Sequence, residues 1–305
     1  MPVDHQESLV KYCTSETGLK ILSTQTLRWS APHLFSDPFE LDHTTKLSFD
    51  PHILLQASIK MATAMIFAKE APRGKSPLAN AVRRWREEER FASPDEAEDV
   101  LSELLSPLID QRQASIDKVM TDWRKFTRTL RICSFSAKPD NLASWQQYAD
   151  NHRGIALRFK CGEFTALPTP KQVEYKNMQQ EISTLKDQLD VIMNNNPLTE
   201  QNHFYEKFTT RPSIHSPTQE WRCFQQVEED LNSSNAADDT WFKDTKFERG
   251  EITAIYFGIF TDPQIKREIY ALVKSKYSEA KNFQARTVAG KCEIGFDRIT
   301  SSKPG

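Results

Sequence analysis

Residues 131–159 predict a strand, a helix and a second strand, and this unit constrains the fold more than any other part of the chain. The first strand is expected at 131–135, which is rich in β-branched and aromatic residues. Apolar and aromatic side chains then recur at three- and four-residue spacing, as on one face of a helix: Leu142, Trp145, Tyr148, Ala149 and His152. Asp140 or Asn141 can cap this helix, and Gly154 stands where it should stop. Alternation over 155–159 predicts the second strand.

The side chains of this block allow two interpretations. Ser134 and Ser136 flank Phe135 and therefore share one face of the first strand. With the Trp, Tyr and His of the helix they can offer ring faces and hydrogen-bonding groups to a flat ligand. The alternative is an amphipathic helix packed on a sheet, which explains Trp145 and Ala149 equally well.

The composition indicates a folded protein without an overall electrostatic preference. The chain has 305 residues, 38% of them hydrophobic, and a formal net charge of −2. This charge predicts no general surface for nucleic acid, although a local basic strip is compatible with it. The five cysteines form no CxxC pair, which favours reduced thiols over a disulfide framework or a structural zinc site. Neither a signal peptide nor a run of about 20 apolar residues is present, so we expect a soluble, cytoplasmic protein without a membrane contact.

The order of the expected elements predicts one elaborated α+β domain over residues 1–305, with a mixed sheet as its core. Residues 52–128 are helical throughout and form an expected insertion or lid, and 177–210 form a second helical insertion. Further strands are expected at 9–12, 27–30, 173–175, 220–227, 252–260, 285–288 and 293–299. Further helices are expected at 17–23, 177–194, 204–208 and 263–277, and an acidic loop at 228–239.

Four blocks, in order, carry a resemblance to a known family. They are VKY at 10–12; WSAP at 29–32 with FSDPFE at 35–40; SFS at 134–136 with Trp145, Tyr148-Ala149 and His152-Arg153-Gly154; and QEWR at 219–222. They resemble the bacterial family called domain of unknown function 2971, with Ser36 where that family has Asn. In the family's Trp-x-x-Glu-x-Glu-Trp-Arg block, His215 replaces the Trp and Thr218 the first Glu. The family supplies no established reaction.

A second resemblance supplies a mechanism. A basic residue in an opening strand, an aromatic and serine block and a late Glu on a strand are similar to the pattern of ADP-ribosyltransferases that use NAD. The resemblance implies an ADP-ribosyltransferase-like scaffold, NAD as substrate and, through toxin-like members, a role in bacterial anti-phage defence or a toxin system. In transferases with a Glu-x-Glu or Gln-x-Glu pair the upstream residue helps to select the acceptor, so Thr218 implies altered acceptor choice or a weakened enzyme.

Glu220 is the candidate catalytic residue. Cleavage of the bond between nicotinamide and ribose passes through an oxocarbenium-like state, which a nearby carboxylate stabilises. Trp221 and Arg222 can anchor this Glu, and the alternative is an exposed Glu paired with a neighbouring Arg. The candidate NAD-binding residues are Lys11, Tyr12, Ser134, Ser136, Trp145, Tyr148 and His152.

Several of these candidates have a purely structural alternative. Lys11 can contact the pyrophosphate or a ribose, or it can be a surface lysine at a strand edge. His152 can act in the site or bond locally beside Gly154. Asp37 and Glu40 are further candidates, although Asp37 fits a cap of its own loop better than catalysis.

Three functions are therefore compared. The first is an NAD-dependent ADP-ribosyltransferase or NAD-cleaving effector, whose acceptor is a protein or a nucleic acid. The second is a non-catalytic sensor that binds a partner of a defence system through the helices of 52–128. The third is a nuclease with Asp37, Glu40, Glu220 and Lys11 around a divalent ion. No metal is predicted, because the seven histidines lack metal-ligand spacing, and phosphate-loop, GxGxxG, HExxH and GxSxG motifs are missing from the sequence.

Overall fold

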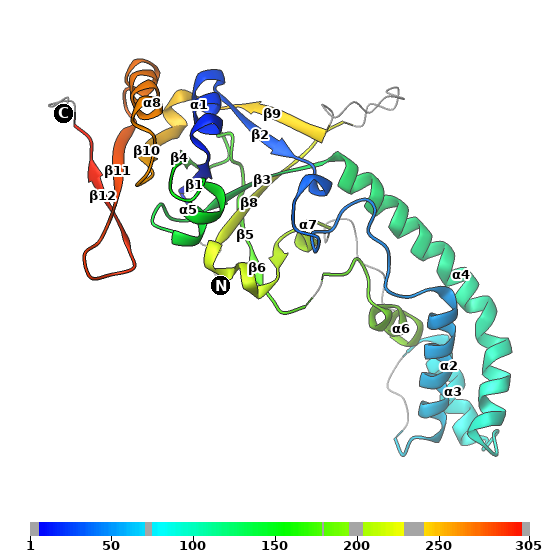
Figure 1. Cartoon of the computed structure of the whole chain (residues 1–305). Helices are drawn as coiled ribbons and strands as arrows, with labels where there is room; N and C mark the ends of the chain where they lie inside the picture. Colours follow the sequence, from blue (N-terminus) through cyan, green and yellow to red (C-terminus); the bar gives the residue numbers. More distant parts are fainter. Residues whose placement is uncertain (1–5, 71–74, 179, 195–203, 229–240, 301–305) are drawn as a thin grey trace. The chain divides into compact units, whose positions relative to one another are not determined.

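The computed structural model describes residues 6–70, 75–178, 180–194, 204–228 and 241–300, and these form a mixed α+β fold (Figure 1). The chain divides into two compact units. The first contains residues 1–40, 128–179 and 208–305 and holds the sheets. The second, called the helical unit, contains residues 41–127 and 180–207, close to the two ranges expected to be helical insertions.

The first unit is built on a large mixed sheet. Its strands are β1 (Ser8–Cys13), β2 (Thr26–Ser30), β3 (Leu130–Ser136), β4 (Ile155–Lys160), β5 (Lys171–Gln172), β8 (Glu220–Gln226), β9 (Phe242–Lys246), β10 (Ile252–Phe257), β11 (Lys281–Thr287) and β12 (Ile294–Arg298). The order along the sheet is β12-β11-β10-β4-β1-β3-β2-β9, and β8 pairs with β3 and β5. The pair β10–β11 is parallel, whereas the other pairs of this sheet are antiparallel. Two short strands, β6 (Glu174–Tyr175) and β7 (Thr210–Arg211), pair separately.

The sheet divides at β3, and this division places the site. Along its full length β3 pairs with β8, from Leu130 opposite Gln226 to Ser136 opposite Glu220. On its other edge β3 meets β2 only at Ile132 and β1 only at Ser136. The backbone of Ser134, between these two points, therefore faces a gap between β1 and β2 instead of a neighbouring strand.

Helices cover both faces of the sheet. The helices α1 (Ser15–Thr24) and α8 (Pro263–Lys276) contact each other and place Leu22 and Ile269 in the larger core, and Figure 1 shows them side by side. The opposite face carries α5 (Leu142–Tyr148), whose Trp145 packs with Val10 and Ala156. Each fully buried side chain of this size contributes about 1.5–3 kcal/mol to the free energy of folding.

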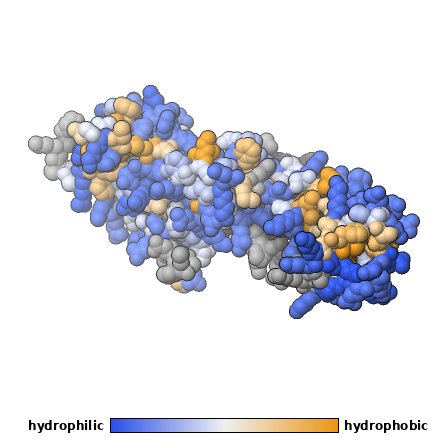
Figure 2. Space-filling view, turned by 90° about the horizontal axis from the view of Figure 1, so that it is seen from below, coloured by the Kyte–Doolittle hydropathy of each residue, from blue (hydrophilic) through white to orange (hydrophobic). Residues whose placement is uncertain are grey.

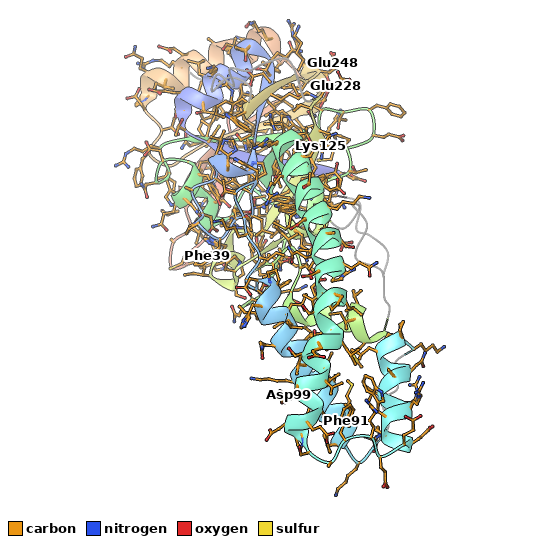
Figure 3. The ribbon with its side chains drawn as sticks, turned by 90° about the vertical axis from the view of Figure 1, so that its right-hand side faces the viewer. Phe39, Phe91, Asp99, Lys125, Glu228 and Glu248 are labelled. Carbon is orange, nitrogen blue, oxygen red and sulfur yellow. The ribbon has the colours of Figure 1, made fainter. Side chains whose placement is uncertain are left out.

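The helical unit contains α2 (Pro51–Phe67), α3 (Pro77–Glu87), most of α4 (Pro94–Thr129), α6 (Leu185–Asn194) and α7 (Phe204–Lys207). The first three begin with a capping residue followed by proline, because this pair satisfies a free backbone N–H and presets the backbone conformation. The capping side chains of Asp50, Ser76 and Ser93 accept hydrogen bonds from the backbone N–H groups of Ile53, Ala79 and Glu96, respectively. Figure 3 shows Asp99 and Lys125 near the two ends of α4. Exposed apolar side chains of this unit include Ile53, Phe67 and Leu104, and Figure 2 shows orange apolar surface on it.

The helix predicted from Asn141 is shorter than expected. Asn141 caps it by accepting from the Ser144 N–H at 2.9 Å, but α5 ends at Tyr148, before Gly154. Asp150, Asn151 and His152 all have positive φ, which a continuing helix does not allow. The expected single face is wrong as well, because Leu142 and Tyr148 are exposed whereas Trp145 and Ala149 are buried.

Other boundaries also differ. The helix expected at 177–194 begins only at Leu185. Of the strand expected at 173–175 only Glu174 and Tyr175 form a strand, β6, and Val173 separates it from β5. The strand expected at 252–260 ends at Phe257, and the strand expected at 285–288 begins earlier, at Lys281. Residues 195–203 of the second expected insertion and 229–239 of the acidic loop lie outside the described residues. Within the described ranges, none of the helices combines the length and apolar character that a membrane span requires.

Candidate functional site

A cavity of about 330 Å³ opens where β1 and β2 separate along β3. Nine of the predicted candidate residues line it: Lys11, Tyr12, Asp37, Glu40, Ser134, Ser136, Tyr148, Glu220 and Arg222. They come from segments spread from Lys11 to Arg222, so the gap in the sheet brings together groups that the sequence separates. Of the candidate residues named from the sequence, Trp145 and His152 are not among its lining residues.

Glu220, the first residue of β8, lies in the wall of the cavity and is 4% exposed. Its Oε2 accepts from Arg211 Nη1 at 2.8 Å, and its Oε1 accepts from Arg222 Nε at 2.8 Å. Its backbone N–H donates to the Tyr175 hydroxyl at 2.7 Å. Burial alone would raise the pKa of Glu220, but Arg222, Arg211 and the Ser134 hydroxyl lower it to about 2. The carboxylate is therefore ionised and firmly oriented at neutral pH.

Two further acids complete a buried ion-pair network. Asp37 Oδ2 lies 2.8 Å from Arg211 Nη2, and Glu40 accepts from both terminal nitrogens of Arg222. Although burial opposes it, the hydrogen bond from Arg211 lowers the pKa of Asp37. Asp37 also accepts a hydrogen bond from the backbone N–H of Phe39, as expected for a loop cap. His215 Nε2 lies 3.1 Å from Asp37 Oδ2. Asp37 thus serves the loop and the network together.

The charges of this network do not cancel. It holds three carboxylates, Asp37, Glu40 and Glu220, against the two guanidinium groups of Arg211 and Arg222. One negative charge is therefore in excess among these five side chains. Since all five side chains are at most 11% exposed, water screens this charge poorly. The network accordingly presents one negative charge to a cavity whose lining also includes the cations Lys11 and Arg28.

Lys11 brings a separate positive charge to the same cavity. Its Nζ donates to the carbonyl oxygen of Ser134 at 2.9 Å, the backbone group that faces the gap in the sheet. The ammonium also lies 3.6 Å from Cys133 Sγ and 5.3 Å from the centre of the Phe135 ring. Among the described residues no carboxylate forms an ion pair with Lys11. Lys11 is half-buried on β1, which lies between β3 and β4, so the alternative of a surface lysine at a strand edge is wrong.

The hydroxyl groups around the cavity are largely engaged with the protein. The Tyr12 hydroxyl donates to the carbonyl of Lys138 at 2.6 Å and accepts from the N–H of Asn141, which fixes the start of α5. Ser136 Oγ donates to the carbonyl of Thr218 at 3.1 Å. The Thr218 hydroxyl donates to the carbonyl of His215 at 2.7 Å. Thr218 therefore holds the loop before Glu220 rather than pointing a free group at an acceptor.

Four aromatic residues line the cavity: Tyr12, Phe35, Phe135 and Tyr148. Tyr148, at the end of α5, is 39% exposed, and its hydroxyl bonds with the side chain of Arg211. Burial and the neighbouring charge of Glu220 raise the pKa of Tyr148. Phe35 lies under Arg222, whose guanidinium carbon is 5.5 Å from the ring centre. Tyr148 is thus the most exposed of the aromatic residues that line the cavity.

Trp145 and His152, by contrast, support the site from behind. Trp145 is fully buried, donates from Nε1 to the carbonyl of Pro139 at 2.7 Å and packs edge-on against Tyr12. His152 stacks on Trp145 with 6.2 Å between ring centres. Burial lowers the pKa of His152, and its backbone carbonyl accepts from the N–H of Phe260. Neither residue lines the cavity, so the structure gives no support to their predicted role as ligand-binding residues there.

Sequence reasoning missed Arg211 and Tyr175, which position Glu220. Arg211 and Tyr175 lie opposite each other in the parallel pair β6–β7. Both strands have two residues, too short for hydrophobic alternation to be recognised. A single Arg between Thr and Pro carries no local signal, so its three acidic partners become apparent only in the folded chain.

The acids of the site do not form a metal-binding group. In the parts of the chain that the structure describes, no set of three or more His, Cys, Asp or Glu side chains has a geometry suited to a metal ion. Asp37, Glu40 and Glu220 are each bonded to a guanidinium, so a divalent ion would have to displace an arginine to use them. Comparison of the chain with protein-family models, curated proteins and solved structures finds no match.

Proposed function

We propose that the cavity binds NAD and that the protein is an NAD-cleaving enzyme of the ADP-ribosyltransferase type, with Glu220 as its catalytic carboxylate. The observation that carries the proposal is the buried network around Glu220, which has one negative charge in excess. NAD combines a cationic nicotinamide ring with an anionic pyrophosphate. The same cavity offers this negative wall and the ammonium of Lys11, so both charges of such a ligand find a partner.

The size of the cavity sets which part of NAD it holds. A volume of about 330 Å³ lies at the lower end of the range for small-molecule sites. It accommodates the nicotinamide and its ribose, with the accessible ring of Tyr148 available for stacking, while the rest of the dinucleotide extends outward.

The chemistry then follows from charge. The bond between the nicotinamide nitrogen and the ribose carbon breaks, its electron pair leaves with nicotinamide, and positive charge develops on the ribose. A fixed, ionised carboxylate in a poorly screened site stabilises that charge. Because its pKa is about 2 and both oxygens accept from guanidinium groups, Glu220 acts through its charge and not as a proton acceptor. An acceptor, protein or nucleic acid, or water would then take the ADP-ribosyl group.

A non-catalytic ligand sensor is the second candidate. It is favoured by the complete pairing of Glu220, which leaves neither carboxylate oxygen without an arginine. In that case the cavity would bind NAD without cleaving it, and the exposed apolar residues of the helical unit would bind the partner. A nuclease is less favoured, because the acids it needs are already bonded to arginines. The setting we propose, bacterial defence or a toxin system, rests on the resemblance alone.

The test is release of nicotinamide from NAD, measured by mass spectrometry, together with NAD binding by calorimetry. The native chain is compared with Glu220→Gln and with a matched control, Glu251→Gln, which alters another buried Glu, one that bonds the backbone of Ala166 and Glu248. Circular dichroism shows that each variant is folded at the assay temperature. We expect Glu220→Gln to release at least about 100-fold less nicotinamide and the control to match the native chain.

Each other outcome has a definite meaning. Release at the native rate by Glu220→Gln contradicts the role of this residue. Binding of NAD without release by the native chain contradicts the enzyme and supports the sensor. If the native chain neither binds nor cleaves NAD, the proposed function is wrong.

A further inference from the structure

One face of the strands β10, β11 and β12 carries a cluster of three aromatic rings (Figure 1). Tyr256 on β10 pairs with Phe283 on β11, and Phe296 on β12 pairs with the second residue after Phe283, so the three side chains share one side of the sheet. The Tyr256 and Phe283 rings stack with 5.0 Å between their centres, and Phe296 packs edge-on against Tyr256 at 4.9 Å. Tyr256 is buried, whereas Phe283 and Phe296 are partly exposed. This side of the three strands is called the aromatic face below.

The helices leave the outer part of the aromatic face open. On β10 the residues Ile255 and Phe257 alternate with Tyr256, and they pack with Ile269 of α8 in the larger core, so α8 covers the other side of the sheet. On the same side as the aromatic face, α5 packs over β1 and β4 through Trp145. Beyond it, β11 and β12 carry rings that remain partly exposed to solvent.

Three cations surround the rings on the same side. Arg158 on β4 and Lys281 on β11 both pair with Ala254, so they flank β10 one step along the strand from the stacked rings. Arg298 on β12 pairs directly with Phe283. Because paired residues of neighbouring strands point to the same side, all three positive charges belong to the aromatic face.

The protein does not neutralise these charges. Over the described ranges no ion pair involves any of the three side chains. Asp297 is the only acid among the residues of β4, β10, β11 and β12, and it points to the other side because it precedes Arg298 in a strand. Asp140, in the loop before α5, lies near the aromatic face: burial raises the pKa of Tyr256, and the charge of Asp140 adds to the rise. Three cations against this one carboxylate leave two positive charges in excess.

We propose that the aromatic face binds single-stranded nucleic acid. Rings on an open sheet surface stack with unpaired bases, and cations beside the rings hold the phosphates that link those bases. The bases of a double helix are stacked on one another, so they do not reach Phe283 and Phe296. The net charge of the whole chain is −2, so the attraction is local to this face. The proposal is independent of NAD cleavage, because none of these rings or cations lines the first cavity.

The test is fluorescence anisotropy of the full chain with a labelled single-stranded RNA of about 12 nucleotides, the single-stranded DNA of the same sequence and the duplex of that DNA. We expect each single strand to bind at least about 10-fold more tightly than the duplex. The two single strands separate a surface for RNA from one that accepts both, and either result supports the proposal.

Two double variants separate stacking from charge. Lys281→Ala, Arg298→Ala should weaken binding about 10-fold or more and reduce the slope of log affinity against log salt by about 1.4, because two phosphate contacts are lost. Phe283→Leu, Phe296→Leu should also weaken binding about 10-fold or more, but without changing that slope. Since Lys281 and Arg298 are exposed, the charge variant remains informative even if the ring variant does not fold.

The controls change the same kinds of side chain elsewhere. Lys274→Ala, Lys276→Ala removes two exposed lysines of α8, the helix that covers the other side of the sheet. Phe164→Leu removes a ring that is 94% exposed and does not belong to the aromatic face. Both should keep the native affinity, and thermal unfolding shows that every variant is folded.

Three results would overturn the proposal. The first is that neither single strand binds saturably. The second is that the duplex, or heparin as a polyanion without bases, binds as tightly as the single strands, which would indicate general attraction to negative charge or an acidic protein partner. The third is that the α8 variant weakens binding as much as Lys281→Ala, Arg298→Ala.

Discussion

Arg211 Nη1 lies 2.8 Å from Glu220 Oε2, and this contact joins the short strand β7 to the first residue of β8. The same guanidinium reaches Asp37 with Nη2 and lies 3.4 Å from Glu40 with Nε. One side chain thus holds three acids of the site. The negative wall of the cavity depends on this arrangement, because without Arg211 the acids would repel each other and take up protons.

The first prediction concerns the stability that Arg211 provides. Arg211→Met removes a charge that is 7% exposed and leaves buried carboxylates without their partner. We expect a loss of about 3–5 kcal/mol in the free energy of unfolding, measured by urea denaturation. Arg286→Met is the matched control, since Arg286 pairs with Asp297 at the surface, and there we expect a change within about 1 kcal/mol. Equal losses in both variants would show that the buried network has no special role.

The second prediction concerns pH. The pKa of Glu220 is about 2 in the folded chain, below its ordinary value of 4.5. Its ionised form therefore stabilises the fold fully above the unfolded pKa, and this contribution is lost as the pH falls toward 2. We expect the free energy of unfolding of the native chain to decrease more steeply between about pH 5 and pH 2 than that of Glu220→Gln.

The measurement is a series of urea unfolding curves across this pH range. Glu293→Gln, which changes an exposed Glu beside Lys291, should keep the native slope. Asp37, whose pKa is also lowered, continues to contribute in every variant, so some slope remains in all of them. An unchanged slope in Glu220→Gln would contradict the lowered pKa of this carboxylate.

The third prediction concerns Tyr148 as a stacking surface for the proposed ligand. Tyr148→Ala should weaken NAD binding by up to about 10-fold, because an aromatic contact contributes about 0.5–1.5 kcal/mol, whereas Tyr148→Phe should keep most of the affinity. The control is Leu142→Ala at the other end of α5, which has a similar exposed fraction but does not line the cavity. Titration calorimetry measures all four proteins, and equal effects of Tyr148→Ala and Leu142→Ala would argue against stacking.

The fourth prediction concerns the turn behind the site. A Cβ atom on Gly258 would lie 2.2 Å from the carbonyl oxygen of His152 and 2.8 Å from that of Gly154, both backbone atoms that cannot move aside cheaply. Gly258→Ala should therefore destabilise the protein by about 1–3 kcal/mol or more. A Cβ on Gly250 meets nothing within 4 Å, so Gly250→Ala should leave stability unchanged or raise it by about 0.4–1 kcal/mol. Thermal unfolding distinguishes the two, and similar melting temperatures would contradict the close approach.

Much of the fold is predictable from local patterns. The alternation in β1, β3 and β4 and the pairs of capping residue and proline before α2, α3, α4 and α8 act over a few residues, so the sequence contains them. The end of α5 was misjudged, because a helix-like spacing continues to His152 while the chain turns through three residues with positive φ. That turn is stabilised by distant contacts, such as Phe260 N–H to His152 carbonyl.

The candidate site shows the same division. Glu220, Ser134, Ser136 and Tyr148 were recognisable as polar or aromatic residues at the ends of expected elements, and they do line one cavity. The sequence did not reveal that Trp145 and His152 lie outside the cavity, because a buried Trp and a ligand-binding Trp have the same local pattern. Arg211 had no local signal at all.

From the amino-acid sequence alone follow the mixed α+β class, the positions of most helices and strands, and the residue types available for chemistry. The gap between β1 and β2 along β3, the meeting of Arg211 with three acids and the placement of Lys11 against the carbonyl of Ser134 belong to the tertiary structure. The reason is physical: backbone geometry and capping depend on neighbours in the chain, whereas the charge balance of a buried site depends on groups that only folding brings within a few ångströms of each other.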